Sequence, residues 1–385
     1  MGGEELTPEE LSLKKHKEWQ GKLRIVSKVK VNTREDLTLA YTPGVAEPCK
    51  EIYKDRNEVY KYTFKGNTVA VVTDGTAVLG LGDIGPEAAL PVMEGKAVLF
   101  KEFAGIDAFP ICLDTKDVDE IVNTVKYISP VFGGINLEDI SAPRCFEVED
   151  RLKAELDIPV FHDDQHGTAI IVLAGLINSF KLLNKDLSAK VVVNGAGAAG
   201  TAITKLLLTF GFKNIIVCDK NGILDTQDES INFAQKELAR LTNPENIKGD
   251  LSRALKGADI FIGVSAPNIV SEEMISAMNK DPIVFAMSNP VPEIMPDKAK
   301  NAGAKIIGTG RSDFPNQVNN VLAFPGIFRG ALKTRKQITD DMKIAASYAI
   351  ANMVPEEELN YEYILPEPFK PGIADAVAQA VARSA

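Results

Sequence analysis

The segment PVFHDDQHGTAII, residues 159–171, places two adjacent aspartates between apolar residues. Asp163 and Asp164 also have a histidine on either side, His162 and His166. Burying such groups beside a core is costly unless a cation, a proton or hydrogen bonds compensate the charge. The segment therefore predicts a site that binds something rather than a stretch of ordinary core.

A second acidic pair, Glu138 and Asp139, ends the run GGINLEDI. Both pairs stand at the carboxyl ends of predicted strands, where ligands bind in open α/β sheets. Four like charges brought together repel one another unless a cation compensates, and carboxylate oxygens suit Mg2+ or Mn2+. A zinc site that uses His162 and His166, or helix capping by Asp164, are the alternatives. We predict a site for a hard divalent cation.

A glycine-rich turn follows an apolar run in VVVNGAGAAG, residues 191–200. Gly195, Gly197 and Gly200 have the spacing of a dinucleotide-binding loop, and a helix is predicted to begin near Ala198. The glycines allow close approach of the backbone to a pyrophosphate, and the helix N-terminus supplies N–H donors. An ordinary glycine-rich turn is the alternative, but the strand–turn–helix context favours a dinucleotide site.

The next predicted strand, IIVCD, ends on Asp219, at the distance expected for a residue that binds the cofactor ribose. A carboxylate there favours NAD, because it would repel a ribose 2′-phosphate. Lys220 follows directly and leaves NADP open. The sequence therefore predicts a dinucleotide without deciding between NAD and NADP.

Strands and helices alternate along the chain, which predicts an α/β fold. Before residue 165 the strand-like runs TVAVVTDG, DAFPICLD, FGGINLEDI and IPVFHDD are separated by helical segments, one of which spans residues 87–103. A long apolar helix at 168–183 leads to a second unit, which contains the glycine-rich turn. We therefore predict an N-terminal α/β domain for substrate and metal at residues 1–160. A Rossmann-type dinucleotide-binding domain with C-terminal helices is predicted at residues 161–385.

Composition and charge exclude several classes of partner. The 385 residues carry a net charge of −10, and a surface of that sign does not neutralise nucleic-acid phosphates. We also expect no membrane partner, because no apolar run reaches bilayer length and residues 1–20 lack the apolar core of a signal peptide. The four cysteines are scattered without a C-x-x-C pair, so we expect a reducing, cytoplasmic setting.

With these motifs together, the chain resembles the short prokaryotic malic enzymes over nearly its whole length. The matching segments occur in one order and are YTPGVAEP, VVTDGTAVLGLGDIGPEAALPVMEGKAVLFK, INLEDI, FHDDQHGTA, GAGAAG, MSNP and NNVLAFPGIFRGAL. The resemblance implies oxidative decarboxylation of L-malate to pyruvate and CO2, with NAD(P)+ and with Mn2+ or Mg2+. It also implies site residues, namely the cation ligands Glu138, Asp139 and Asp164 with Asp163 beside them, the catalytic Tyr41 and Lys96, the substrate-holding Asn320, and Asn289 beside both substrate and cofactor.

The implied residues suit the implied reaction. A base must take the malate hydroxyl proton as hydride leaves C2, and Lys96 serves if a dry site and nearby charges lower its pKa. We count Asp163 with the catalytic residues, since it is expected to support Asp164 or to tune the pKa of Lys96. Tyr41 can return a proton to C3 of the enolate. The two neighbouring histidines are expected to orient these acids rather than to bind the cation.

One position departs from the family. Larger relatives carry an arginine in the segment that here reads DGTAVLGLG, where Ala77 stands. Such an arginine would clamp a malate carboxylate in a bidentate manner. The asparagines, the metal or another arginine must therefore do more of the binding, and Arg24, Arg311 and Arg329 are the candidates.

Three rival functions fit parts of the sequence. A malolactic enzyme would use the same residues, keep NAD bound and release lactate. An amino-acid dehydrogenase also places a lysine-bearing substrate domain before a Rossmann domain, but its chemistry leaves the acids unexplained. A redox sensor that binds NAD without turnover leaves Lys96 and Tyr41 without a role.

The N-terminal region bears on the oligomeric state. Its first residues predict a polar helix, and Tyr41 directly precedes the rigid turn TPG. A catalytic residue on such a peripheral loop is consistent with a homodimer. Each active site would then be completed by the neighbouring chain.

Overall fold

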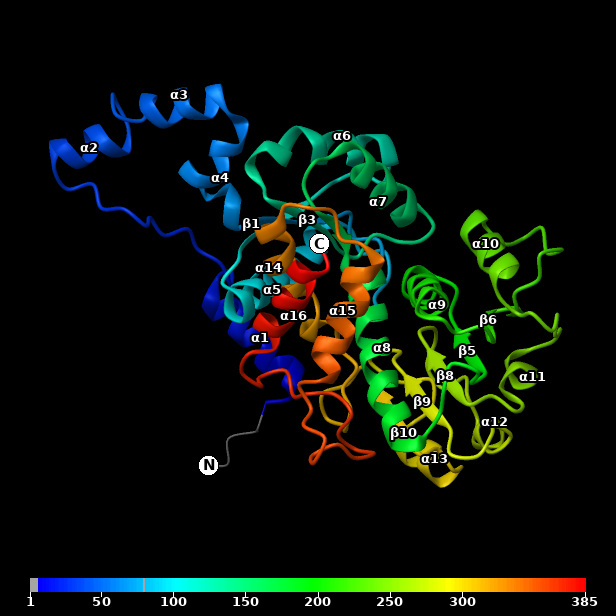
Figure 1. The fold of residues 1–385 in the computed structure, drawn as a ribbon. Helices are drawn as coiled ribbons and strands as arrows, with labels where there is room; N and C mark the ends of the chain where they lie inside the picture. The colour runs from blue at the N-terminus through cyan, green and yellow to red at the C-terminus, as the bar shows by residue number, and fades with distance from the viewer. Residues whose placement is uncertain (1–5, 79) are drawn as a thin grey trace.

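Two β-sheets form the framework of the molecule, and the computed structural model describes residues 6–78 and 80–385 (Figure 1). The first sheet has four parallel strands in the order β2-β1-β3-β4. The second has six strands in the order β10-β9-β8-β5-β6-β7, parallel except for β7. The predicted α/β class is confirmed. The strands are β1 Thr68–Thr73, β2 Asp107–Cys112, β3 Gly134–Leu137, β4 Val160–His162, β5 Val191–Asn194, β6 Ile215–Asp219, β7 Gly222–Ile223, β8 Ile260–Gly263, β9 Ile283–Ala286 and β10 Ile306–Thr309.

Helices bury both faces of the first sheet, which explains the continuous apolar runs of its central strands. Alternate residues of β1 point to opposite faces. Val69 and Val71 share a core cluster with Phe100 of α5, whereas Ala70 and Val72 pack with residues of α6 and α7. The covering helices are α5 (Pro86–Ala104), α6 (Val118–Ile128) and α7 (Arg144–Glu155).

The long helix α8, Asp163–Leu183, follows β4 and leads to the second sheet. It begins earlier than the sequence predicted. We expected Asp163 and Asp164 to end a strand, but β4 stops at His162 and the two acids form the first turn of the helix. By length and composition α8 is apolar enough to cross a membrane, yet 67% of its apolar window is buried inside the protein. It is the core helix of this molecule.

The second sheet carries the glycine-rich turn at its carboxyl edge. β5 ends at Asn194, and α9, Ala198–Phe210, begins directly after the turn. β5 lies between β8 and β6, so the turn stands where the strand order reverses, which is the usual ligand position in such sheets. Further helices of this half are α10 (Phe233–Leu241), α11 (Leu251–Leu255), α12 (Glu272–Ser276) and α13 (Pro296–Asn301).

Three helices near the C-terminus are α14 (Phe324–Thr334), α15 (Asp340–Ala351) and α16 (Ile373–Arg383). They return to the first sheet, since α14 packs on α5, α16 on α14 and α15 on α8. Phe100 of α5 contacts Phe324 and Phe328, with ring centroids 4.8 and 5.3 Å apart. Residues assigned to the second predicted domain thus complete the core around the first sheet. The boundary at residue 160 stays a prediction.

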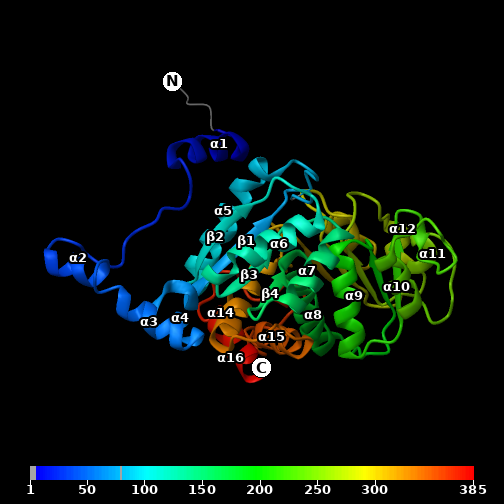
Figure 2. The same ribbon diagram turned by 90° about the horizontal axis from the view of Figure 1, so that it is seen from above.

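An N-terminal arm, which we define as residues 6–64, contributes nothing to this core. Its helices are α1 (Pro8–Trp19), α2 (Arg34–Ala40), α3 (Ala46–Lys54) and α4 (Val59–Tyr62), and none of them has a buried residue. Figures 1 and 2 show α2 and α3 lying away from the rest of the molecule. We refer to residues 65–385 as the body.

Candidate active site

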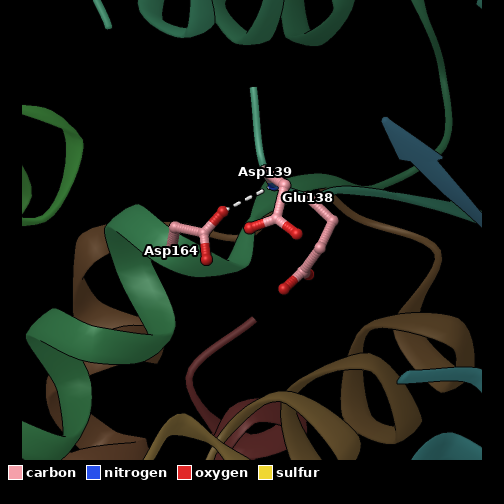
Figure 3. Close-up of side chains that lie close together, drawn as sticks. All are labelled: Glu138, Asp139 and Asp164. Atoms are coloured by element: carbon pink, nitrogen blue, oxygen red, sulfur yellow. Dashed lines mark hydrogen bonds between the residues drawn. The ribbon is translucent and has the colours of Figure 1, made fainter. Parts of the chain in front are cut away.

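Three carboxylates converge where β3 and β4 end (Figure 3). Because β3 and β4 are neighbouring parallel strands, Glu138 and Asp139 emerge beside the first turn of α8, which carries Asp164. One ligand atom from each side chain lies within 4.8 Å of the other two. The Asp139 N–H also donates to Asp164 Oδ2 across 2.8 Å. The structure thus brings the two acidic motifs together.

The acids fit a cation. Glu138 and Asp139 are 4% and 3% exposed, and Asp139 Oδ2 is buried without a hydrogen-bond partner among the described residues. Burial, together with the charges of Asp164 and Glu138, raises the pKa of Asp139 to about 9. A donor set made only of carboxylate oxygens suits Mg2+ or Mn2+, and either ion would relieve this repulsion.

The two histidines of the acidic motif lie outside the oxygen set. His162 is fully buried, and its Nδ1 lies 3.7 Å from Asp164 Oδ2, beyond hydrogen-bond distance. His166 Nε2 instead lies 2.9 Å from the carboxylate of Glu149 in α7. The geometry therefore favours the oxygen-ligated cation over the alternative zinc site.

Lys96 of α5 also contacts two of the acids, Asp163 and Glu138. Its Nζ lies 2.6 Å from Asp163 Oδ2 and 2.8 Å from Glu138 Oε1, and the residue is 8% exposed. Burial alone would lower the pKa of Lys96, but the attraction of Asp163, Glu138 and Asp164 is larger and raises it. We expected the pKa of Lys96 to be lowered, and this is wrong while the neighbouring carboxylates are charged. Their negative charges stabilise the protonated lysine.

Asp163 contacts Lys96 through one carboxylate oxygen, and its other oxygen lies near Gly167. Burial raises the pKa of Asp163 to about 7 despite the lysine. At Gly167 a Cβ would stand 1.9 Å from Asp163 Oδ1 and 3.0 Å from the Asn320 Cβ. Gly167 thus lets Asn320, which opens the 3-10 turn Asn320–Leu322, approach the acid. The structure brings this predicted substrate residue to the site.

Asn289 lies in the turn after β9, and it is exposed. A Cβ at Gly80, in the glycine-rich loop of the first half, would stand 2.7 Å from the Asn289 carbonyl oxygen. Close backbone contact of this kind needs glycine, whose φ here is +77°. The loop after β1 and the turn after β9 therefore meet at Asn289.

Tyr41 is the predicted site residue that the single chain leaves apart. It follows α2 in the N-terminal arm and is 67% exposed. Lys96 is buried within the body, whereas α2 lies away from it (Figure 2). The fold of one chain alone does not bring these two residues together.

The glycine-rich turn has the shape that its spacing predicted. Gly195 has a φ of +117°, and a Cβ at Gly200 would stand 1.6 Å from the Gly195 carbonyl oxygen. Nothing lies within 4 Å of a Cβ built at Gly197, and α9 begins at Ala198 without a side-chain cap. The open turn and uncapped helix end are suited to a pyrophosphate. Asp219 ends β6, as predicted.

One supporting network was missed in the sequence. Arg144 Nη1 lies 2.9 Å from the buried Asp74 Oδ2, and Nη2 donates to the hydroxyl oxygens of Thr76 and Ser141. Ser141 lies two positions after Asp139, so the network fixes the loop that carries the acids. Its signal was present, because Asp74 ends a buried strand in VVTDG just as the other acids do.

Two of the three candidate arginines are engaged elsewhere. Arg311 binds Asp313 through two hydrogen bonds of 2.8 and 2.6 Å, and Arg329 lies 2.9 Å from Asp375. The structure therefore does not select either one to replace the arginine missing at Ala77.

Comparisons with known proteins agree with this geometry. The family model "Malic enzyme, N-terminal domain" matches residues 20–153, and "Malic enzyme, NAD binding domain" matches residues 165–385. The chain is 61% identical to the bifunctional malic/malolactic enzyme of Bacillus subtilis, over 98% of this chain and 92% of that protein. It is 59% identical to the NAD-dependent malic enzyme of Geobacillus stearothermophilus, over 95% and 77%. The crystal structure of the NAD-dependent malic enzyme of Thermotoga maritima superposes with a TM-score of 0.93 at 52% identity, covering 96% of this chain and 98% of that one. The chain belongs to the malic enzyme family.

Proposed function

We propose that this chain catalyses the oxidative decarboxylation of L-malate to pyruvate and CO2, with NAD+ as hydride acceptor and Mn2+ or Mg2+ as cation. One observation carries the proposal. Lys96 Nζ contacts both Glu138, a proposed cation ligand, and Asp163, a proton acceptor. A proton-handling group and a cation site thus share one buried cluster, in a chain whose second sheet carries a dinucleotide turn.

Lys96 and Asp163 handle the hydroxyl proton in this proposal. Their 2.6 Å hydrogen bond gives a route for a proton from the ammonium to the carboxylate. The neutral lysine then takes the malate hydroxyl proton as hydride leaves C2 for the nicotinamide. When bound, the divalent cation supplies Lewis acidity at the substrate oxygen and neutralises carboxylates around the lysine. After CO2 leaves, Tyr41 donates a proton to C3 of the enolate.

Substrate and cofactor are held by residues from both halves of the body. Asn320 and Asn289 can donate amide hydrogens to the malate carboxylates without adding charge near the acids. Gly195, Gly197 and Gly200 admit the pyrophosphate, with Ala198 opening the helix. Asp219 accepts from the ribose in the same scheme, which favours NAD+ over NADP+.

Reduced-nicotinamide absorbance tests the reaction. With L-malate and NAD+, we expect a rise that requires Mn2+ or Mg2+ and that yields pyruvate; NADP+ should give a slower rise. Asp164→Asn should abolish the cation-dependent rise while NAD+ binding persists. NAD+ binding without any turnover would instead support the redox-sensor function and overturn the proposal.

A malolactic activity is the second candidate, and one observation favours it. The Bacillus subtilis relative is named a bifunctional malic/malolactic enzyme and matches this chain over almost its whole length. The activity would use the same residues but return the hydride to pyruvate within the site. Lactate formation from malate without accumulation of NADH would establish it, and lactate absent under all cofactor conditions would exclude it.

We further propose that the working form is a homodimer with shared active sites. Tyr41 is exposed, and the arm around it carries Leu39, Val29 and Ile25 at exposures of 70, 61 and 91%. Apolar surface of this extent marks a protein interface. In a twofold dimer the arm of one chain would cover the other and deliver Tyr41 to its Lys96.

Mixing two inactive variants tests the sharing. In a heterodimer of Tyr41→Phe and Lys96→Ala chains, one site receives an intact lysine and an intact tyrosine. Random exchange should therefore restore about a quarter of the wild-type activity, since half of the dimers are mixed and each has one complete site. If exchanged mixtures stay inactive, Tyr41 acts within its own chain.

We also propose a cytoplasmic location. All four cysteines are free thiols, and Cys145 and Cys218 are buried. Burial raises the pKa of Cys218 to about 12, so this thiol stays protonated and unreactive. Expression without disulfides in a reducing lysate should give fully active protein, and activity that needs oxidation would contradict the assignment.

A further inference from the structure

A buried carboxylate outside the proposed catalytic set holds the start of α8. Glu149 of α7 is 3% exposed. Its oxygens accept from the His162 N–H across 3.1 Å and from His166 Nε2 across 2.9 Å, and Lys153 Nζ lies 2.7 Å away. His162 and His166 bracket Asp163 and Asp164 in the sequence. Glu149, on a different helix, therefore forms hydrogen bonds with the turn that carries Asp163 and Asp164.

The charge on Glu149 is secured. Burial opposes ionisation, but His166 and Lys153 outweigh it, and the pKa of Glu149 lies well below its ordinary value. Burial also lowers the pKa of His166 to about 4, so Lys153 is the charged partner near neutral pH. An ionised carboxylate is also stabilised near the N-terminal end of a helix, where the N–H groups point outward. The contact is thus a set of charge-assisted hydrogen bonds, which are stronger and more directional than neutral ones.

The first turn of α8 lacks a cap of its own. His162 occupies the capping position, but its side chain makes no capping hydrogen bond, and neither ring nitrogen has a partner among the described residues. Asp163 and Asp164 are held by Lys96 and by the Asp139 N–H. Those bonds are made by residues of the proposed site itself. Besides the strand pairing of β4, Glu149 supplies the hydrogen bonds that reach the turn from outside.

We propose that Glu149 is a positioning residue for the cation site: it fixes the first turn of α8 so that Asp164 meets Glu138 and Asp139. This inference rests on the proposed function, because it takes those three carboxylates as the cation ligands. Glu149 itself touches neither cation nor substrate. Groups that orient the ligands of a metal are commonly worth about ten- to a hundred-fold in metal affinity.

Mn2+ affinity of Glu149→Gln, measured by electron paramagnetic resonance without substrate, tests the role. Glutamine keeps the oxygen that accepts from the His162 backbone N–H and lies beside Lys153, but it loses the charge and the second acceptor. His166 then loses its partner, and Lys153 loses its counter-charge. We expect Mn2+ to bind about ten-fold more weakly or worse, while NAD+ affinity changes little in the folded variant. The loss in kcat/KM should shrink as Mn2+ is raised.

Asp150→Asn is the matched control. Asp150 is the next residue on α7 and is exposed, and among the described residues it makes no hydrogen bond to the start of α8. Its Mn2+ affinity should equal that of the wild type. If Asp150→Asn weakens Mn2+ as much as Glu149→Gln does, general loss of negative charge explains the result and the positioning role is overturned.

A second variant covers the case in which Glu149→Gln does not fold. His166→Phe keeps a ring beside Phe161, whose centroid lies 5.4 Å from the His166 ring, but removes one hydrogen bond to Glu149. It should also weaken Mn2+ without affecting NAD+. Unchanged Mn2+ affinity in a folded variant of either kind overturns the positioning role alone. Failure of the wild-type chain to bind Mn2+ overturns the cation site, and the role of Glu149 with it.

Discussion

The body and the N-terminal arm of this molecule are stabilised in opposite ways. In the body, strands such as β1 are buried at every position, and even charged side chains such as Lys96 and Asp163 are enclosed. In the arm, no residue from 6 to 64 is buried, and even the large apolar side chains of Ile25 and Tyr53 are 91 and 92% exposed. Within one chain, the apolar side chains of the body pack against one another. In the single chain, most of the apolar side chains of the arm stay exposed, although Phe64 contacts Phe109 of the body with ring centroids 6.1 Å apart.

The starts of α1 and α2 in the arm are set by local signals, whereas the start of α8 in the body is set by a tertiary contact. α1 and α2 each begin with a capping box, in which Thr7 pairs with Glu10 and Thr33 with Asp36. Such boxes satisfy the first N–H groups without any help from the rest of the fold. α8 has no such box, and it starts where Glu149 of another helix holds it. The starts of these two arm helices are therefore set locally, whereas the start of α8 depends on a contact from another helix.

Replacing Lys96 has the largest expected effect and sharpens the comparison. Lys96→Ala should lower kcat by about 10²- to 10⁴-fold, as is typical for loss of a general base. It should also lower the free energy of unfolding by about 3 kcal/mol, because the variant leaves Asp163 and Glu138 buried without the ammonium group that pairs with them. Steady-state kinetics and denaturant unfolding measure both quantities.

Tyr41→Phe gives the contrast, since it should lower kcat without any change in unfolding. Lys101→Ala on the same helix as Lys96 is the control, because the Lys101 side chain is 53% exposed. Equal stability losses for Lys96→Ala and Tyr41→Phe would break the distinction between body and arm.

Two glycines of the nucleotide turn come next. At Gly200 a Cβ would strike the Gly195 carbonyl oxygen, so Gly200→Ala should cost about 1–3 kcal/mol of stability by overpacking and abolish NAD+ binding. At Gly197 the space is open, so Gly197→Ala should leave the free protein within about 0.5 kcal/mol of the wild type. It should still weaken NAD+, whose pyrophosphate approaches the backbone there.

Thermal melts and NAD+ titration by fluorescence separate the two glycine variants. The two variants compare a position where the added methyl group meets protein, Gly200, with one where it meets only open space, Gly197. We expect the fold to tolerate the methyl group only at Gly197. Equal melting temperatures for both variants would mean that the turn opens more easily than its contacts indicate.

Much of the body was readable from the sequence, and the reasons are local. Strand-length apolar runs and the spacing of Gly195, Gly197 and Gly200 depend on short segments, and the structure places each where expected. The start of α8 was missed because Asp163, Asp164 and the residues up to Gly167 show no helical apolar period. The contact from α7 that fixes this turn comes from a distant segment.

The convergence of the three acids was predictable from the sequence, but the charge state of the lysine beside them was not. Convergence of the acids followed from neighbouring strand ends, which a parallel sheet requires. The pKa of Lys96 did not follow, because its direction depends on whether burial or the carboxylates contribute more. The separation of Tyr41 from Lys96 in the single chain did not follow either, because it depends on where the arm lies relative to the body.

Cation binding should stabilise the body and leave the arm unaffected. Mn2+ at about one hundred times its Kd should raise the free energy of unfolding by about 2.7 kcal/mol, and chelation should reverse this. Asp139→Asn should abolish most of the gain. Calorimetry with and without a chelator measures it, and an equal gain in Asp139→Asn would place the ion elsewhere.

The stabilisation by cation should grow with pH. Because the folded pKa of Asp139 is raised to about 9, the folded chain keeps a proton that the unfolded chain has lost. Without cation, stability therefore falls as pH rises from the ordinary value of an aspartate through about 9. The cation offsets that loss, so its effect should be larger at pH 9 than at pH 6. A pH-independent gain would mean that Asp139 is ionised in the free protein.

A substitution with no expected effect on the single chain belongs to the arm and tests the comparison most directly. Ile25→Ser should leave the unfolding of the single chain unchanged, because this side chain is already exposed. If the arm packs on a second copy, losing one buried isoleucine costs about 1.5–3 kcal/mol and weakens the dimer by about ten- to a hundred-fold. Sedimentation at low protein concentration measures the dissociation. Leu241→Ser is the matched control, since Leu241 is an exposed apolar residue of the body at 51%. Dissociation that responds to Leu241→Ser and not to Ile25→Ser would move the interface to the body and leave Tyr41 without a route to a neighbouring site.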